Sequence, residues 1–126
     1  MKLVFTEKAP VPAGHYSQAV VHGGLVYVSG QLPVVPGGGP PPEEIEGQAQ
    51  RALLNLEAVL KGAGSSLDRV LQVTVYVSDI SMWDRVNAVY ARMFGDHRPA
   101  RAVVPTRELH FGFMVEIDAV AAVNRE

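Results

Sequence analysis

The sequence predicts an α+β fold in which two helices cover one face of a mixed β-sheet. Two amphipathic segments, at 45–61 and from 81 to about 94, repeat their apolar residues about every 3.6 positions and predict the helices. Short valine-rich segments before, between and after them predict strands. The length of 126 residues fits one domain, which we take to span residues 1–126.

The first part of the chain predicts a β-hairpin. We expect strands at 18–21 and 25–29, with a further short strand at 2–5. His22, Gly23 and Gly24 join the hairpin strands, and glycine allows the positive φ that a tight turn requires. The proline- and glycine-rich stretch at 33–42 predicts a loop.

The first predicted helix carries one apolar stripe. Glutamates at 43, 44 and 46 place negative charge at its start, where that charge complements the helix dipole. Gly62 and Gly64 are expected to end it. The stripe consists of Ala49, Ala52, Leu53, Leu56, Val59 and Leu60.

The second predicted helix begins at Ser81, where Asp84 three positions on forms a weaker version of a capping box. Gly95 is expected to end it. The predicted buried stripe consists of Trp83, Val86, Tyr90, Met93 and Phe94.

The remaining strands are expected at 70–77, 102–106 and 113–123. In the first of these, alternation places Leu71, Val73, Val75 and Val77 on one face and Gln72, Thr74 and Tyr76 on the other. The last strand presents a mixed apolar and acidic set on the face away from the helices, namely Met114, Glu116, Asp118, Val120 and Ala122. Since two helices cover only one face of a sheet, this composition favours packing between copies and clefts between subunits.

Composition excludes several classes of function. The net charge is −2 and the basic residues are scattered, which argues against a nucleic-acid partner. The chain has no cysteine, so thiolate catalysis and zinc–thiolate sites are excluded, and the four histidines lack the spacing of a helical metal pair. Neither a signal-peptide start nor an apolar run of about 20 residues is present, so we expect a cytoplasmic protein without membrane contact.

Seven blocks of sequence, in order, resemble a known family. Gly14-His15-Tyr16-Ser17-Gln18-Ala19 resembles the segment G-P-Y-S-Q-A, and Val28-Ser29-Gly30-Gln31-Leu32-Pro33 resembles the turn S-G-Q-(I/L)-P. Residues 48–64, 73–79, 86–87, 99–101 and 115–119 match later blocks. Over about residues 9–122 the chain is thus similar to the Rid (YjgF-type) enamine/imine deaminases.

The resemblance implies a chorismate-mutase-like fold that assembles as a homotrimer around a central barrel, with clefts between neighbours. It also implies hydrolytic deamination of 2-aminoacrylate-type enamines and their 2-iminopropanoate or 2-iminobutanoate tautomers to 2-keto acids and ammonia. The family uses no metal or organic cofactor.

Two residues would carry this chemistry. Arg101 matches the family's carboxylate-binding arginine, and a guanidinium binds a carboxylate through two parallel hydrogen bonds. Glu116 matches the family's water-positioning glutamate, and it would move protons between water and the substrate nitrogen. Asp118 is the second candidate acid. Arg101 and Glu116 each have an alternative interpretation as part of a structural ion pair. The hypothesis requires Arg101 and Glu116 to converge on one crevice at a subunit boundary.

Further residues are expected to bind the substrate. Tyr16, alternatively a half-buried strand tyrosine, would wall the pocket, and Ser29 and Gly30 would border the substrate. Asn87 would contact the substrate or pin neighbouring backbone, and the Val103 N–H would join Arg101 at the carboxylate.

His15 and His110 replace prolines usual in the family, and both are interpreted as solvent-facing loop residues whose position near the cleft could alter substrate range.

Three other functions remain open from the sequence. The chain could bind a small carboxylate, such as a keto acid, without turning it over. It could be a related deaminase that acts on 3-aminoacrylate. A nuclease or translation-inhibitor role is the third, and the acidic balance counts against it.

Overall fold

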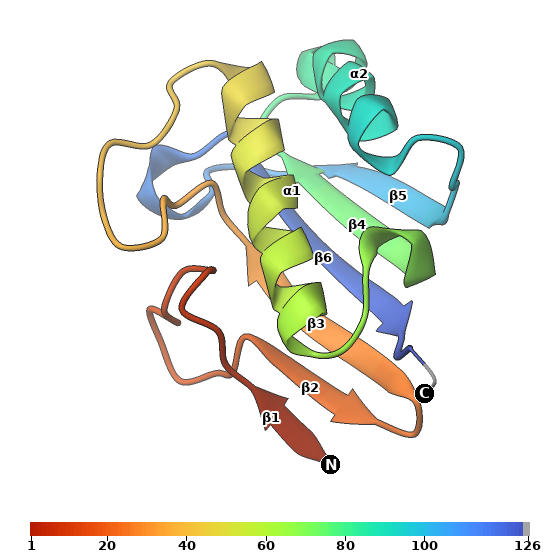
Figure 1. Ribbon diagram of the computed structural model, residues 1–126. Coiled ribbons are helices and arrows are strands. Elements are labelled where there is room, and N and C mark those ends of the chain that lie inside the picture. The colour runs from red at the N-terminus through yellow and green to blue at the C-terminus, as the bar shows by residue number, and fades with distance from the viewer. Residues whose placement is uncertain (125–126) are drawn as a thin grey trace.

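A computed structural model describes residues 1–124, and in it both helices lie on one face of a six-stranded sheet (Figure 1). The helices are α1 (Ile45–Gly62) and α2 (Trp83–Phe94). The strands are β1 (Lys2–Val4), β2 (Ala19–His22), β3 (Leu25–Gln31), β4 (Val70–Val77), β5 (Ala100–Pro105) and β6 (Val115–Ala122). Single 3₁₀ turns cover Leu67–Arg69 (η1), Ile80–Met82 (η2) and His110–Gly112 (η3). The predicted two-helix, mixed-sheet architecture is confirmed.

The sheet order is β1-β2-β3-β6-β4-β5, which places β6 at the centre although it is last in the chain. Only β4 and β5 pair in parallel, and α2 makes the crossover between them. The predicted hairpin is confirmed, since His22 pairs with Leu25 and Gly23 and Gly24 have φ of 61° and 80°. The sequence prediction therefore located this turn correctly.

The core lies between the helices and the sheet. Along β6 the residues Val115, Ile117, Ala119 and Ala121 are buried, while the alternate residues from Glu116 to Ala122 are half-buried on the open face. The open face of the sheet also carries exposed apolar side chains, among them Leu3, Tyr27 and Val104. The predicted mixed apolar and acidic face is thus present.

Two details of the prediction were wrong. Leu71 is 50% exposed, because the pairing of β4 with β6 shifts register between Val70 and Gln72 and buries Val70 instead. The second helix starts at Trp83 and not at Ser81, because Ser81 lies in a preceding 3₁₀ turn. That turn is capped by Asp79, whose carboxylate accepts a hydrogen bond from the Ser81 N–H at 2.9 Å.

The stripe of α2 also differs in part. Val86, Tyr90 and Phe94 are buried as expected, but Val89 joins them, whereas Met93 is only half-buried and Trp83 is 39% exposed. Gly95 ends the helix with φ of 64°, as predicted.

In the part of the chain that the structure describes, β5 is the last strand of the sheet, and no other strand pairs with its outer edge. Thr106 donates its N–H to the Val77 carbonyl at 2.8 Å, toward β4. Because backbone N–H groups alternate in direction along a strand, the N–H groups of Arg101 and Val103 and the nitrogen of Pro105 point to the free edge. The edge therefore offers donors at positions 101 and 103. Within residues 1–124, no helix is long and apolar enough to cross a membrane.

Candidate active site in two halves

Arg101 forms the centre of the first group of candidate residues. It pairs with Val73 of β4, a residue buried beneath the helices, so its side chain lies on the helix side of the sheet. Its Nη1 donates a hydrogen bond to Asn87 Oδ1 at 2.8 Å. The guanidinium carbon lies 4.6 Å from the ring centre of Tyr90 and 5.6 Å from that of Trp83. We call Asn87, Tyr90, Trp83, Arg101 and the Val103 N–H the arginine half-site.

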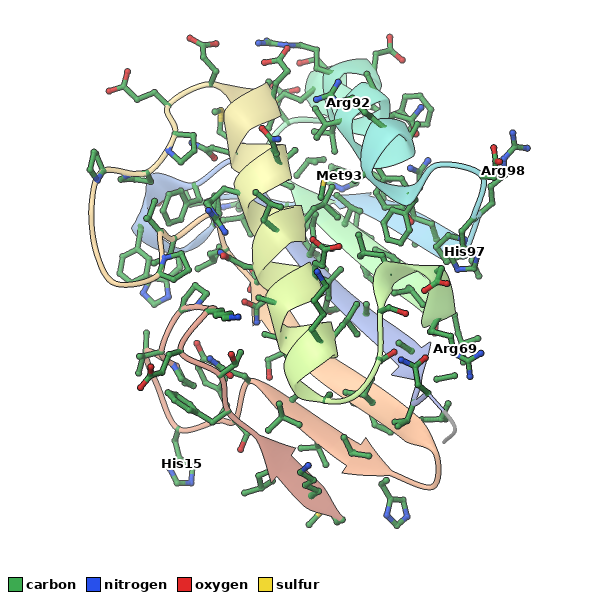
Figure 2. The ribbon with its side chains drawn as sticks, viewed as in Figure 1. His15, Arg69, Arg92, Met93, His97 and Arg98 are labelled. Carbon is green, nitrogen blue, oxygen red and sulfur yellow. The ribbon has the colours of Figure 1, made fainter. Side chains whose placement is uncertain are left out.

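The arginine half-site can bind an anion. It borders a cavity of about 490 Å³ between α2 and β5, with His97 and Arg98 at the connecting turn (Figure 2). Asn87 accepts from one guanidinium nitrogen and the aromatic rings hold the plane, which leaves most of the N–H donors available. Such a held, planar fork matches the two oxygens of a carboxylate.

Glu116 forms the centre of the second group. It pairs with Tyr76 of β4 on the open face of the sheet. Its carboxylate packs against the backbone of Gly30, in a stretch of β3 where the pairing with β6 shifts between Val28 and Gln31. A Cβ at position 30 would overlap the Glu116 carboxylate, so glycine is what allows this close approach.

This second group surrounds a cavity of about 350 Å³. Its lining, which we call the glutamate half-site, consists of Tyr16, Ser29, Gly30, Leu32, His110 and Glu116. Burial raises the pKa of the Glu116 carboxyl above its ordinary value, the negative charge of Asp118 raises it further, and His110 opposes both. A raised pKa brings a carboxyl closer to the pH range in which it can both accept and return a proton.

The segment before β2 positions the tyrosine wall of this cavity. The buried Gln18 side chain accepts from the Thr6 N–H at 2.7 Å and donates to the Thr6 and Pro10 carbonyls, both at 3.0 Å. Ser29 Oγ donates to the Ser17 carbonyl at 2.6 Å, so its hydroxyl hydrogen serves to hold this segment. Tyr16 is consequently fixed at the cavity mouth while remaining 51% exposed.

Comparison with known proteins identifies the family. The model of the family described as Endoribonuclease L-PSP matches residues 6–123. The chain belongs to this family, the YjgF/RutC family. The resemblance found in the sequence blocks is thereby confirmed.

Similar YjgF/RutC proteins span almost the whole chain. A RutC family protein of Pyrococcus abyssi is 40% identical over 121 residues, which cover 95% of each chain. The structure of RidA from a Psychrobacter species is 35% identical, with a TM-score of 0.94 and coverage of 98% of this chain and 100% of that one. The structure of Escherichia coli TdcF with bound serine is 33% identical, with the same TM-score and the same coverage.

Within one chain of this YjgF/RutC protein, Arg101 and Glu116 do not meet. Arg101 shares the helix face with Val73, whereas Glu116 shares the open face with Tyr76. The structure does bring Asn87 to Arg101, and it brings Tyr16, Ser29 and Gly30 to Glu116. A crevice that contains both charged groups would therefore need a second copy of the chain.

Two contacts of the site were not predicted from the sequence. Trp83 and Tyr90 contact Arg101, although the sequence assigned them to the buried stripe of α2. Their i, i+7 spacing around Asn87 was the available signal. His110 is an exposed loop residue, as expected, and it lines the glutamate half-site. His15, by contrast, projects from its loop (Figure 2) and lines neither cavity.

Proposed function

We propose that this chain hydrolyses enamine and imine intermediates of the 2-aminoacrylate and 2-iminopropanoate type to 2-keto acids and ammonia. The observation that carries the proposal is the Glu116 carboxylate, which is held against Gly30 at a cavity wall and has a raised pKa. Imine hydrolysis needs a water delivered to carbon and protons moved to nitrogen, and such a carboxyl can take a proton from that water and later return it to nitrogen. Neither step requires a metal or an organic cofactor.

Arg101 is proposed to bind the substrate carboxylate, together with the Val103 N–H at the free edge of β5. The aromatic rings and Asn87 hold the guanidinium in one plane before substrate arrives, which reduces the entropy lost on binding. The serine bound to TdcF is a small molecule with a carboxylate and a nitrogen on the adjacent carbon. This supports a ligand of the same kind here.

The active unit is proposed to be a homotrimer with a central barrel formed by the open sheet faces. Two observations support it: the open face carries exposed apolar residues such as Leu3 and Tyr27, and the two half-sites lie on opposite faces of one sheet. A rotationally repeated contact would place the arginine half-site of one copy against the glutamate half-site of its neighbour. Light scattering on the purified protein measures the number of subunits directly.

A trapping competition tests the proposed reaction. A serine/threonine dehydratase generates 2-aminoacrylate, semicarbazide traps it, and the protein should suppress trapping while keto acid and ammonia accumulate. Arg101→Ala and Glu116→Gln should each abolish suppression while the assembly stays intact. Wild-type protein that suppresses no trapping with several amino-acid donors would refute the deaminase.

Two other functions have distinct signatures in the same experiments. A carboxylate-binding module would bind a keto acid but never suppress trapping, in the wild type as in Glu116→Gln. A 3-aminoacrylate deaminase would act on an enamine whose nitrogen lies one carbon further from the carboxylate, and it would prefer that substrate over 2-aminoacrylate.

Ribonuclease activity, which the family description names, has less support. The net charge of the chain is −2 and its basic residues are scattered along the sequence, whereas phosphate binding depends on clustered cations. Incubation with RNA is a direct check.

A further inference from the structure

His110 borders the same cavity as Glu116. It stands on the η3 turn, five residues before β6 begins, and it lines the cavity of about 350 Å³ from the same chain as Glu116, Gly30 and Tyr16. Burial raises the pKa of Glu116, and the charge of His110 partly offsets that rise, so the two groups are within electrostatic range of each other. The imidazole therefore faces the space in which the proposed reaction would occur.

An aromatic contact supports this exposed imidazole. Its ring stacks on Phe111 with centres 4.1 Å apart and an angle of 13° between the planes. Phe111 in turn contacts the buried Phe113 edge-on at 6.2 Å. Phe111 has φ of 60°, a left-handed conformation that a bulky residue rarely adopts and that must be stabilised by its surroundings. Strain retained at the rim of a cavity points to a function for the turn.

We propose that His110 is a second proton-transfer residue of the glutamate half-site, working as the partner of Glu116 on the substrate nitrogen and oxygen. The proposal rests on the deaminase function proposed above. It extends that function because imine hydrolysis moves protons at two different atoms, and one carboxyl in its charged form can only accept.

The two groups exchange roles during one turnover. Water forms a C–O bond to the imine carbon and gives a proton to the Glu116 carboxylate, while the C=N π electrons move to nitrogen, which takes a proton from the His110 imidazolium. The product of this step is a carbinolamine. Glu116 then returns its proton to nitrogen, the C–N bond breaks, and ammonia leaves. Neutral His110 takes the hydroxyl proton as the C=O bond forms, and both groups regain their starting charges.

Other titratable groups surround this pair and would influence its pH response. Asp118 lies on the same face of β6 and accepts a hydrogen bond from the Tyr76 hydroxyl of β4 at 3.2 Å. Tyr16 contributes a phenol from the segment before β2. Arg107 and Glu108 precede η3 in the same loop. None of these groups is substituted in the test below, so their effects are common to all variants.

The test compares pH profiles of kcat/KM from trapping competition, normalised at each pH to a control without the protein. The starting state needs charged Glu116 and protonated His110, so the wild-type rate should rise with pH as Glu116 ionises and fall as His110 loses its proton. His110→Asn should lower the rate about 100-fold and remove the alkaline fall while the acid rise remains. Imidazole added to His110→Ala should restore part of the rate. His22→Asn, at the exposed last residue of β2, is the matched control.

A second variant separates the positioning of the His110 ring from its proposed proton transfer. Phe111→Gly keeps the left-handed turn, because glycine adopts positive φ freely, but it removes the ring that stacks on His110. Phe111→Gly should lower kcat about tenfold, and the pH profile should keep its alkaline fall.

An active wild type whose rate and profile are unchanged by His110→Asn would overturn the role of His110 while leaving the deaminase intact. An inactive wild type would instead overturn the deaminase, and the role of His110 with it.

Discussion

Two inactive variants, Arg101→Ala and Glu116→Gln, are expected to restore activity when they assemble together. The reason is that the two side chains lie on opposite faces of one sheet, so each proposed site takes its arginine from one subunit and its glutamate from the next. A site is intact when the arginine side comes from a Glu116→Gln subunit and the glutamate side from an Arg101→Ala subunit. With random assembly from equal amounts, about one site in four meets both conditions, whatever the size of the ring.

The assay is trapping competition on co-expressed subunits, with the ratio of the two chains measured by mass spectrometry. We expect about a quarter of the wild-type rate, against nearly none for either parent. Co-expression of Arg101→Ala subunits with Asn87→Ala subunits is the matched control. Both changes fall on the arginine half-site, so the activity of this mixture should not exceed that of the more active parent. Activity of the first mixture that stays at the level of its parents would refute the shared site.

Three further outcomes follow from single positions. Gly30→Ala should lower activity at least tenfold with little loss of stability, because the added methyl displaces only the flexible Glu116 carboxylate; activity within twofold of wild type would contradict this. Glu116→Gln should raise Tm near pH 7 and have little effect on Tm near pH 4. The pKa of Glu116 is higher in the folded than in the unfolded protein, so its charged form destabilises the fold at pH values above that pKa. An equal change in Tm at both pH values would count against burial as the cause of the raised pKa. Leu53→Ala should lower the free energy of unfolding by about 2–5 kcal/mol in urea titrations, as expected for a fully buried leucine on α1, and a loss of under about 1 kcal/mol would show that the core relaxes around it.

Much of the fold could be predicted from local patterns. The bounds of β4 and the glycine turn after His22 followed from alternation and from the φ that glycine allows. The exposure of Leu71 could not be predicted, because a strand with an irregular register has the same sequence as a regular one until its partner is known. The start of α2 was misplaced because Ser81 falls inside the 3₁₀ turn that Asp79 caps, and Met82, the residue before the helix, makes no side-chain cap.

The sequence predicted which residues belong to the candidate site better than it predicted how they are arranged. The sequence blocks singled out Arg101, Glu116 and Gly30, but which face each side chain occupies depends on pairing across β4. The stacking of His110 on Phe111 could not be predicted, because a left-handed phenylalanine has no sequence signal. Here the tertiary structure, and not the local pattern, determines the surroundings of the chemistry.

Both margins of the sheet discourage unwanted strand addition. β1 has three residues, and at the other margin the Pro105 nitrogen, which carries no hydrogen, occupies a position where β5 would otherwise donate outward. An incoming extended peptide would find too few contacts to extend the sheet indefinitely. The backbone amides of Arg101 and Val103 can thus stay open to a small anion without making the edge of β5 a template for fibrils. If Pro105 provides this protection, Pro105→Val should aggregate faster than the wild type on storage.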